Sequence, residues 1–274
     1  MPTSAKSDKK KDRGGRLTIQ ELSRQLTEKE KIINDQQTVI VKERENAKRW
    51  EYEFREKDRQ YRAADRADPL IKDLGNKNEF EHSLQLRLRA MKKGDTGISV
   101  IFSDGDKFKQ INDTYGHEIG NVILFVTAGL MKNNTRGLDL VCRHSGDEFM
   151  ILLQNCDERG TELVKERLAK AIGTLSVHQE GTIVSVKAKQ YRFASKRVED
   201  VTVYSSDFGE RADDVMRKVS DIFGKKRFGF STGSATITGE REIGKSEAES
   251  VAKGLMNEAD IKMQKVKESK GVAR

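Results

Sequence analysis

Cysteine is scarce in this chain, and long apolar runs are absent. Its 274 residues include only two cysteines, Cys142 and Cys156. Two cysteines exclude a disulfide framework and a cysteine-rich zinc site, and they fit a reduced compartment. No apolar run reaches the roughly 18 residues that a transmembrane helix needs, and the opening MPTSAKSDKKKDRGGR has no apolar core of a signal peptide. We therefore expect a cytoplasmic protein that makes no membrane contact.

The charge is high and is unevenly spread. Charged residues make up 35% of the chain and hydrophobic residues another 35%, so part of the chain is expected to lie outside any core. Residues 1–16 carry six lysines and arginines against two acids, within a net charge of +8. Because no aromatic residues alternate with these charges, we interpret the segment as a disordered basic tail rather than a nucleic-acid-binding or membrane-binding arm.

Residues 17–66 lack both proline and glycine. Apolar residues recur there every seven positions, which predicts a long helix and favours a parallel coiled coil. The second seam of the repeat is half polar, with Lys29, Gln36 and Glu43. Pairing would therefore be weak, and a helix packed on its own domain remains the alternative.

Residues 67–274 alternate between strand-like and helix-like patterns. Asp68-Pro69 ends the first helix, and the apolar alternation of Ile98, Val100 and Phe102 predicts a strand. Two further strands are expected around a tight turn at Ser145-Gly146. A last strand is expected within 227–237, and helices at 78–91, 117–134, 161–172 and 247–270. This order predicts an α+β domain with an antiparallel-rich sheet covered by helices. Residues 173–227 read as an insertion with two strands and a helix, either a subdomain or an elaborated sheet edge.

Two pairs of acids lie at the ends of expected strands. Asp104 and Asp106 end one strand, and Asp147 and Glu148 follow the hairpin turn. If these strands are neighbours, the carboxylates meet at one edge and repel each other unless a cation is present. Mg²⁺ takes hard oxygen ligands and shares its shell with phosphates. Paired Mg²⁺ ions serve nucleotidyl transfer, whereas the alternative is that each acid merely faces water.

Basic and amide side chains accompany these acids. Lys109 lies within a turn of Asp106, and Lys267 lies on the last expected helix, so either could bind phosphate. Asn112 and Asp113 are expected in a loop that continues to His117. An asparagine amide both donates and accepts hydrogen bonds, which suits the edge of a base.

Several motifs together resemble one family. The segments DGDKFKQINDTYGHEIGN, RGLDLVCRHSGDEF, STGSATI and ADIKMQKVK resemble the GGDEF domain of diguanylate cyclases, here in an SGDEF form, over roughly residues 68–271 without the insertion. The resemblance implies a polymerase-palm-like, nucleotidyl-cyclase-like fold. It also implies a bacterial signalling enzyme that joins two GTP molecules into cyclic di-GMP and releases two pyrophosphates. Two facing domains act together, so we expect a homodimer that the N-terminal helix aligns.

The resemblance also assigns roles to residues. Asp104, Asp147 and Glu148 would be catalytic, with Glu148 assisting deprotonation of the ribose 3′-hydroxyl. The metal site, for two Mg²⁺ ions or for Mn²⁺, would comprise Asp104, Gly105, Asp147 and Glu148. Substrate would contact Lys109, Asn112, Asn121, Asp106, Gly146 and Lys267, and a product-inhibition site of RxxD type would use Arg136, Asp139 and Arg167.

Three positions depart from the family pattern. Ser145 replaces the first glycine of the GGDEF motif, and the KESKGVAR ending lacks a phosphate-binding arginine. Asn121 stands where an aspartate would read guanine, and an asparagine offers two donors that an aspartate lacks. Three interpretations therefore stay open: a diguanylate cyclase, an impaired cyclic di-GMP receptor, and a cyclase that also accepts ATP to make cyclic GMP-AMP.

Overall fold

The computed structural model divides the chain into two units, residues 1–62 and 63–274. It describes residues 23–24, 26–31, 33–34, 36–38, 41, 65–192 and 197–272. In the first unit the described residues are helical and exposed. The expected tail over 1–16 and most of the expected helix over 17–66 lie outside the described residues, so coiled-coil pairing stays a prediction.

A four-stranded sheet forms the centre of the second unit. Its strands are β1 (Ile98–Asp106), β2 (Leu140–Ser145), β3 (Glu148–Gln154) and β7 (Gly229–Ile237), in the order β2-β3-β1-β7. All three strand pairs are antiparallel. The first eight residues of β1 are buried, because β1 is an inner strand with helices on both of its faces.

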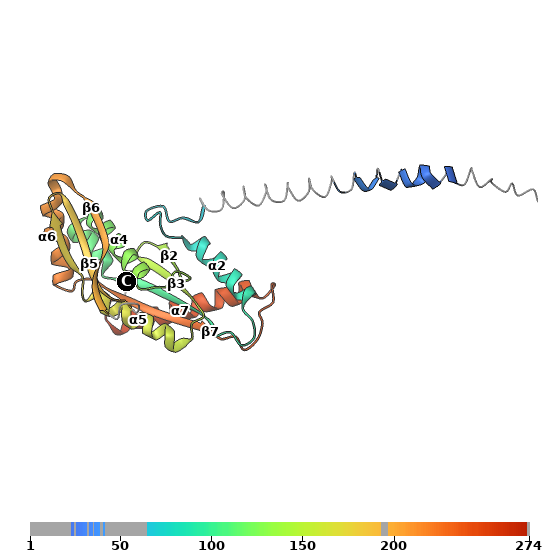
Figure 1. Ribbon diagram of the computed structural model, residues 1–274. Helices are drawn as coiled ribbons and strands as arrows, with labels where there is room; N and C mark the ends of the chain where they lie inside the picture. Colours follow the sequence, from blue (N-terminus) through green and yellow to red (C-terminus); the bar gives the residue numbers. More distant parts are fainter. Residues whose placement is uncertain are drawn as a thin grey trace, which may run out of the picture. The chain divides into compact units, whose positions relative to one another are not determined.

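Helices cover the two faces of this sheet (Figure 1). On one face, α2 (Lys77–Ala90) and α7 (Ala248–Ser269) pack against Ile98, Val100 and Phe102 of β1. On the other face, α4 (His117–Asn133) and α5 (Glu158–Ile172) pack against Ile101 and the apolar residues of β3. The expected α+β fold with an antiparallel sheet flanked by helices is confirmed.

A second, smaller sheet occupies most of the segment read as an insertion. It consists of β4 (Ser176–Glu180), β5 (Ile183–Arg192) and β6 (Arg197–Asp207), in that order. A short 3₁₀ helix (Gly209–Arg211) and α6 (Ala212–Gly224) follow. Apolar residues of β5, β6 and α6 form a core with α4, so α4 is buried between the two sheets. The two strands and the helix were expected, whereas the short strand β4 was not.

Two local expectations were wrong. Residues Phe108–Tyr115 form a helix, α3, where a loop was expected, because Ile111 is buried against α4 while Phe108 and Tyr115 pack beside it. The hairpin turn lies at Gly146-Asp147 rather than Ser145-Gly146. Gly146 has a φ of +46°, which glycine adopts without the cost that a side chain would add. Among the described residues, no helix is long and apolar enough to cross a membrane.

Candidate active site

The register of the sheet brings the two acid pairs together. Asp104 of β1 lies directly opposite Glu148 of β3, and opposite residues in antiparallel strands have Cβ atoms about 5 Å apart. The Gly105 amide donates to the Asp147 carbonyl oxygen at 3.2 Å. A Cβ built on Gly105 would lie 3.1 Å from a carboxylate oxygen of Asp147. The absence of a side chain at position 105 therefore lets the Asp147 carboxylate lie against β1.

A buried lysine from the last helix neutralises Asp104. The Lys267 ammonium of α7 lies 2.6 Å from an Asp104 carboxylate oxygen, and only 6% of Lys267 and 2% of Asp104 are exposed. A buried charge is stable only when it is paired and hydrogen-bonded. Asp104 and Lys267 thus form the buried part of the cluster.

Asp106 is also neutralised, by a residue that sequence reasoning missed. Lys270 donates to one Asp106 oxygen at 2.8 Å and to the Phe230 carbonyl at 2.6 Å. The other Asp106 oxygen accepts from the Ser231 hydroxyl at 2.6 Å. Lys270 follows α7 directly, three residues after Lys267, but this spacing does not show which acid it contacts.

Asp147 carries an unusual pKa. Burial and, to a smaller extent, the nearby Asp104 carboxylate together raise the pKa of its carboxyl to about 6. Ionisation of Asp147 therefore costs more here than in water, and a bound cation would offset that cost. The repulsion between the Asp104 and Asp147 carboxylates therefore favours binding of a divalent cation.

The donor set also fits such a cation. In the part of the chain that the structure describes, no three His, Cys, Asp or Glu side chains already converge on one point. Mg²⁺ is usually held by one or two carboxylates together with substrate phosphates rather than by a complete protein cage. Asp104 and Asp147, on either side of Gly105 in this edge, are carboxylates of the kind that such a partial shell needs.

Ser145 contacts the second acid of the hairpin. Its hydroxyl donates to a Glu148 carboxylate oxygen at 2.6 Å, and Arg143 donates to the Gly146 carbonyl at 2.8 Å. Both bonds span the turn, so Ser145 is compatible with the hairpin and helps to orient Glu148.

Three of the residues expected to contact substrate, Lys109, Asn112 and Asn121, lie on α3 and α4. Asn112 lies against Gly120, the residue before Asn121, because a Cβ on Gly120 would overlap the Asn112 carboxamide oxygen. That oxygen is buried without a hydrogen-bond partner. Lys109 and Asn121 are exposed. The first turn of α3 has no side-chain cap, so its backbone N–H groups can donate hydrogen bonds to an anion.

The residues of the expected inhibitory site line one cavity of about 730 Å³, namely Arg136, Asp139 and Arg167. Asp139 does not pair with the Arg136 guanidinium; its carboxylate accepts from the Arg136 amide at 2.8 Å and the Gln154 amide at 3.3 Å. Burial, and then the charge of Arg136, lower the pKa of Arg167. Two neighbouring guanidinium groups facing one cavity favour an anionic ligand.

Comparison with known proteins identifies the family. The family model described as "Diguanylate cyclase, GGDEF domain" matches residues 67–221, which is more than half of the chain. The chain belongs to the GGDEF family. The match runs through much of the segment that we read as an insertion.

Curated relatives of this GGDEF chain include three diguanylate cyclases. Diguanylate cyclase A of Treponema denticola is 32% identical over 120 residues, covering 42% of this chain and 30% of that protein. DgcS of Shewanella oneidensis is 32% identical over 132 residues, covering 48% of this chain and 43% of the relative. DosC of Escherichia coli is 42% identical over 77 residues, covering 28% and 17%. The matched segments span less than half of each relative's length.

Solved structures support the GGDEF fold. The diguanylate cyclase SiaD of Pseudomonas aeruginosa, solved with its activator SiaC, aligns with a TM-score of 0.51 at 21% identity over 91% of this chain and 76% of that chain. The coiled coil and GGDEF domain of DgcB from Caulobacter crescentus, solved with c-di-GMP, aligns with a TM-score of 0.50 at 16% identity over 82% and 92%. At these identities the likeness concerns the fold alone.

Proposed function

We propose that this GGDEF chain is a diguanylate cyclase that converts two GTP molecules into cyclic di-GMP and two pyrophosphates. The observation that carries this proposal is the sheet edge at which Asp104 lies opposite Glu148 and bonds to Lys267, while Asp147 lies beside Gly105. A protein that only binds cyclic di-GMP has no need for a buried carboxylate-lysine pair next to two further acids. The cytoplasmic setting that we expect agrees with the two free cysteines, Cys142 and Cys156.

Asp104, Asp147 and the Gly105 carbonyl would hold Mg²⁺, or Mn²⁺ in its place, with Glu148 beside them. We expect two ions in each active site. When bound, such ions would neutralise the triphosphate and lower the pKa of the attacking hydroxyl. The chain itself contributes the placement of its carboxylates, which the β1-β3 register sets.

The reaction would proceed in two equivalent transfers. The 3′-oxygen of one GTP forms a bond to the α-phosphorus of the other, and the bond from that phosphorus to pyrophosphate breaks. Glu148 accepts the proton of the 3′-hydroxyl, and the Ser145 hydroxyl fixes the orientation of that carboxylate. The second transfer, with the roles exchanged, closes the ring.

Cations and amides near the cluster would bind the nucleotide. Lys109, Lys267 and the free amides at the start of α3 would contact the triphosphate. The KESKGVAR ending lacks the phosphate-binding arginine of the family. Lys270 of this ending, which bonds to Asp106, would provide a positive charge at the sheet edge. Gly146 leaves the hairpin backbone open to the nucleotide, because a Cβ there would meet nothing within 4 Å.

Asn112 and Asn121 would contact the base. An exposed asparagine at position 121 can rotate its amide to donate or to accept. It therefore discriminates less sharply between guanine and adenine than an aspartate would. A cyclase that also incorporates ATP is for this reason the second candidate function.

Each domain would hold one GTP, so the active species would be a homodimer with facing catalytic edges. Residues 17–66 would align the two domains and raise the effective concentration of one half-site near the other. The cavity at Arg136, Asp139 and Arg167 would bind the cyclic di-GMP product and inhibit turnover.

Paired variants test the assignment of the cluster. Asp147→Asn removes the charge that would hold the metal, and we expect at least about a hundredfold loss of GTP turnover, by analogy with losing one strong electrostatic contact in a transition state. Asp200→Asn is the matched control, because Asp200 lies on β6 with 57% of its side chain exposed. Equal turnover in the two variants would refute the assignment.

A further inference from the structure

A cavity beside α4, between this helix and the second, three-stranded sheet, has no role in the function proposed above. It lies between α4 and β6, has a volume of about 670 Å³ and shares no lining residue with the acidic cluster. Small-molecule sites usually have volumes of about 300–1,000 Å³. Its size therefore suits a ligand of modest mass.

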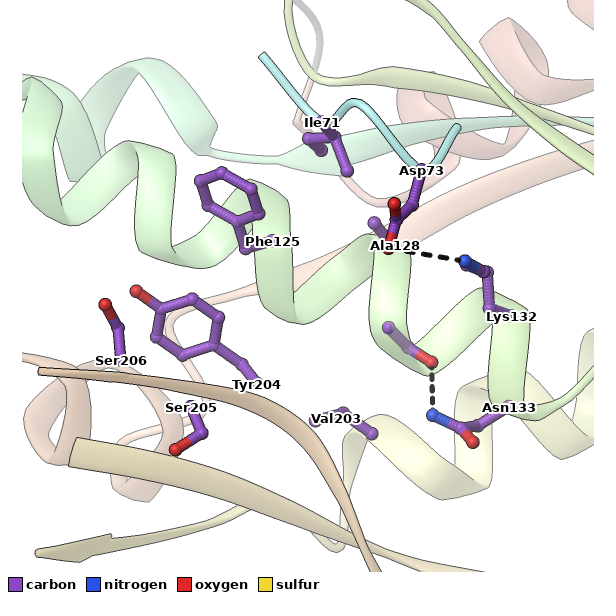
Figure 2. A pocket seen from close by; sticks show the side chains of 11 residues that line it. Ile71, Asp73, Phe125, Ala128, Lys132, Asn133, Val203, Tyr204, Ser205 and Ser206 are labelled. Carbon is purple, nitrogen blue, oxygen red and sulfur yellow. Dashed lines mark hydrogen bonds and ion pairs between the residues drawn. The ribbon is translucent and has the colours of Figure 1, made fainter. Parts of the chain in front are cut away.

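The middle of the cavity is aromatic and apolar. Phe125 of α4 and Tyr204 of β6 stack at a centroid distance of 5.8 Å with an interplanar angle of 28°. Figure 2 shows both rings directed into the space between the helix and the strand. Between Gly129 and Val203 the backbones of α4 and β6 are in contact, because a Cβ on Gly129 would overlap the Val203 carbonyl. This contact bounds one side of the cavity. A planar ring can stack on such an aromatic surface.

The two ends of the cavity are polar. At one end the Tyr204 hydroxyl lies beside Ser206 (Figure 2). A tyrosine hydroxyl is protonated at neutral pH and can donate a hydrogen bond, and burial raises the pKa of the Tyr204 phenol above its ordinary value. At the other end Lys132 and Asp73 form a pair at 4.0 Å, with 48% and 87% of their side chains exposed. An exposed pair of this kind contributes little to stability, so a ligand can displace it at little cost.

We propose that the α4-β6 cavity binds a mononucleotide. Its base would stack on the Phe125 and Tyr204 rings, with its edge bonded to Ser206. Its phosphate would pair with Lys132, and its ribose diol would donate to Asp73, as carboxylates do with ribose hydroxyls elsewhere. This arrangement gives both Lys132 and Asp73 a partner, whereas a simple anion bound to Lys132 would be repelled by the Asp73 carboxylate. The site is separate from the acidic cluster and does not depend on cyclase activity.

Calorimetric titration of the full chain tests the proposal. The probes are adenosine 5′-monophosphate and guanosine 5′-monophosphate, compared with adenosine, guanosine and inorganic phosphate. We expect the nucleotides to bind more tightly than the nucleosides or phosphate. Lys132→Ala should weaken nucleotide binding by about tenfold and change nucleoside binding by less than about twofold, since it removes one charge-assisted contact.

Further variants separate this cavity from the catalytic edge. Tyr204→Leu removes the ring and should weaken nucleotide and nucleoside binding by about tenfold, whereas Tyr204→Phe keeps the ring and should retain most of the affinity. Lys109→Ala is the matched lysine control at the catalytic edge. No binding at millimolar nucleotide would overturn the proposal. Binding that Lys109→Ala weakens and Lys132→Ala leaves intact would overturn it as well. GTP turnover, measured separately, reports on the cyclase proposal alone.

Discussion

Lys267 and Asp104 form a buried ion pair that joins α7 to the end of β1, with a distance of 2.6 Å between ammonium and carboxylate. The two residues are 163 positions apart in sequence. Breaking a buried pair by removing one partner leaves an uncompensated charge and costs about 3–5 kcal/mol. This pair therefore links the stability of the domain to the geometry of the acidic edge.

Lys267→Ala should lower the free energy of unfolding of the metal-free protein by about 3–5 kcal/mol. Urea denaturation in the presence of a chelator measures this. The matched control is Lys262→Ala on the same helix, whose pair with Glu258 is about half exposed and should contribute about 0–1 kcal/mol. Similar losses in both variants would show that the Asp104 pair has no special energetic role.

The raised pKa of Asp147, about 6, predicts a pH dependence of stability. The pKa is higher in the folded state than the ordinary value of 3.8, so the metal-free folded state binds more protons between these two values. Its free energy of unfolding should therefore fall as the pH rises from about 4 to about 6, by roughly 1–2 kcal/mol after allowance for partial solvent screening.

Asp147→Asn should remove this component of the pH profile. Denaturation curves at several pH values in chelator would show a flatter profile for Asp147→Asn than for the unmodified protein and Asp200→Asn. Profiles of equal slope for all three proteins would contradict the assigned cause.

The Ser145-Glu148 hydrogen bond predicts a modest effect on turnover. Ser145→Ala removes the donor to Glu148, and because the bond is exposed we expect about a fivefold fall in kcat, which corresponds to about 1 kcal/mol. Ser145→Gly should behave in the same way, since the turn itself places its positive φ at Gly146. A large gain in turnover for Ser145→Gly would mean that the serine impairs the hairpin.

The cavity at the RxxD segment predicts product binding. Arg136→Ala and Arg167→Ala should each weaken cyclic di-GMP binding by about ten- to a hundredfold, since each removes a charge-assisted contact. Arg159→Ala on the same helix, α5, is the control because Arg159 is exposed and does not line the cavity. Calorimetric titration with cyclic di-GMP measures the affinity of each variant. Unchanged affinity in both Arg136→Ala and Arg167→Ala would refute the site.

Local pattern was sufficient for much of the fold. The alternation of Ile98, Val100 and Phe102 predicted β1. The helix expected at 78–91 is α2, in which Phe80, Leu84 and Leu88 recur every four residues and are completely buried. Helix α3 was missed because eight residues give too few turns for a clear period and its N-terminus has no side-chain cap. Strand β4 was missed because four of its five residues are exposed or polar.

The acids of the catalytic edge could be predicted from the sequence, but their hydrogen-bond partners could not. The acids could be identified because two pairs end expected strands. The bonds from Lys270 to Asp106 and from Ser145 to Glu148 depend on how α7 and the turn are placed in three dimensions. Sequence spacing alone does not give such placement, and the unpartnered Asn112 oxygen depends in the same way on the approach of α3 to Gly120.

Identification of the product formed from GTP tests the central proposal most directly. The full chain is incubated in Mg²⁺ with GTP, with ATP, or with both nucleotides. The products are separated and identified by mass spectrometry. We expect cyclic di-GMP and pyrophosphate from GTP alone, lost in Glu148→Gln, with any mixed cyclic dinucleotide abolished by Asn121→Asp. Tight binding of cyclic di-GMP without any cyclic dinucleotide product would contradict the proposal and identify a receptor.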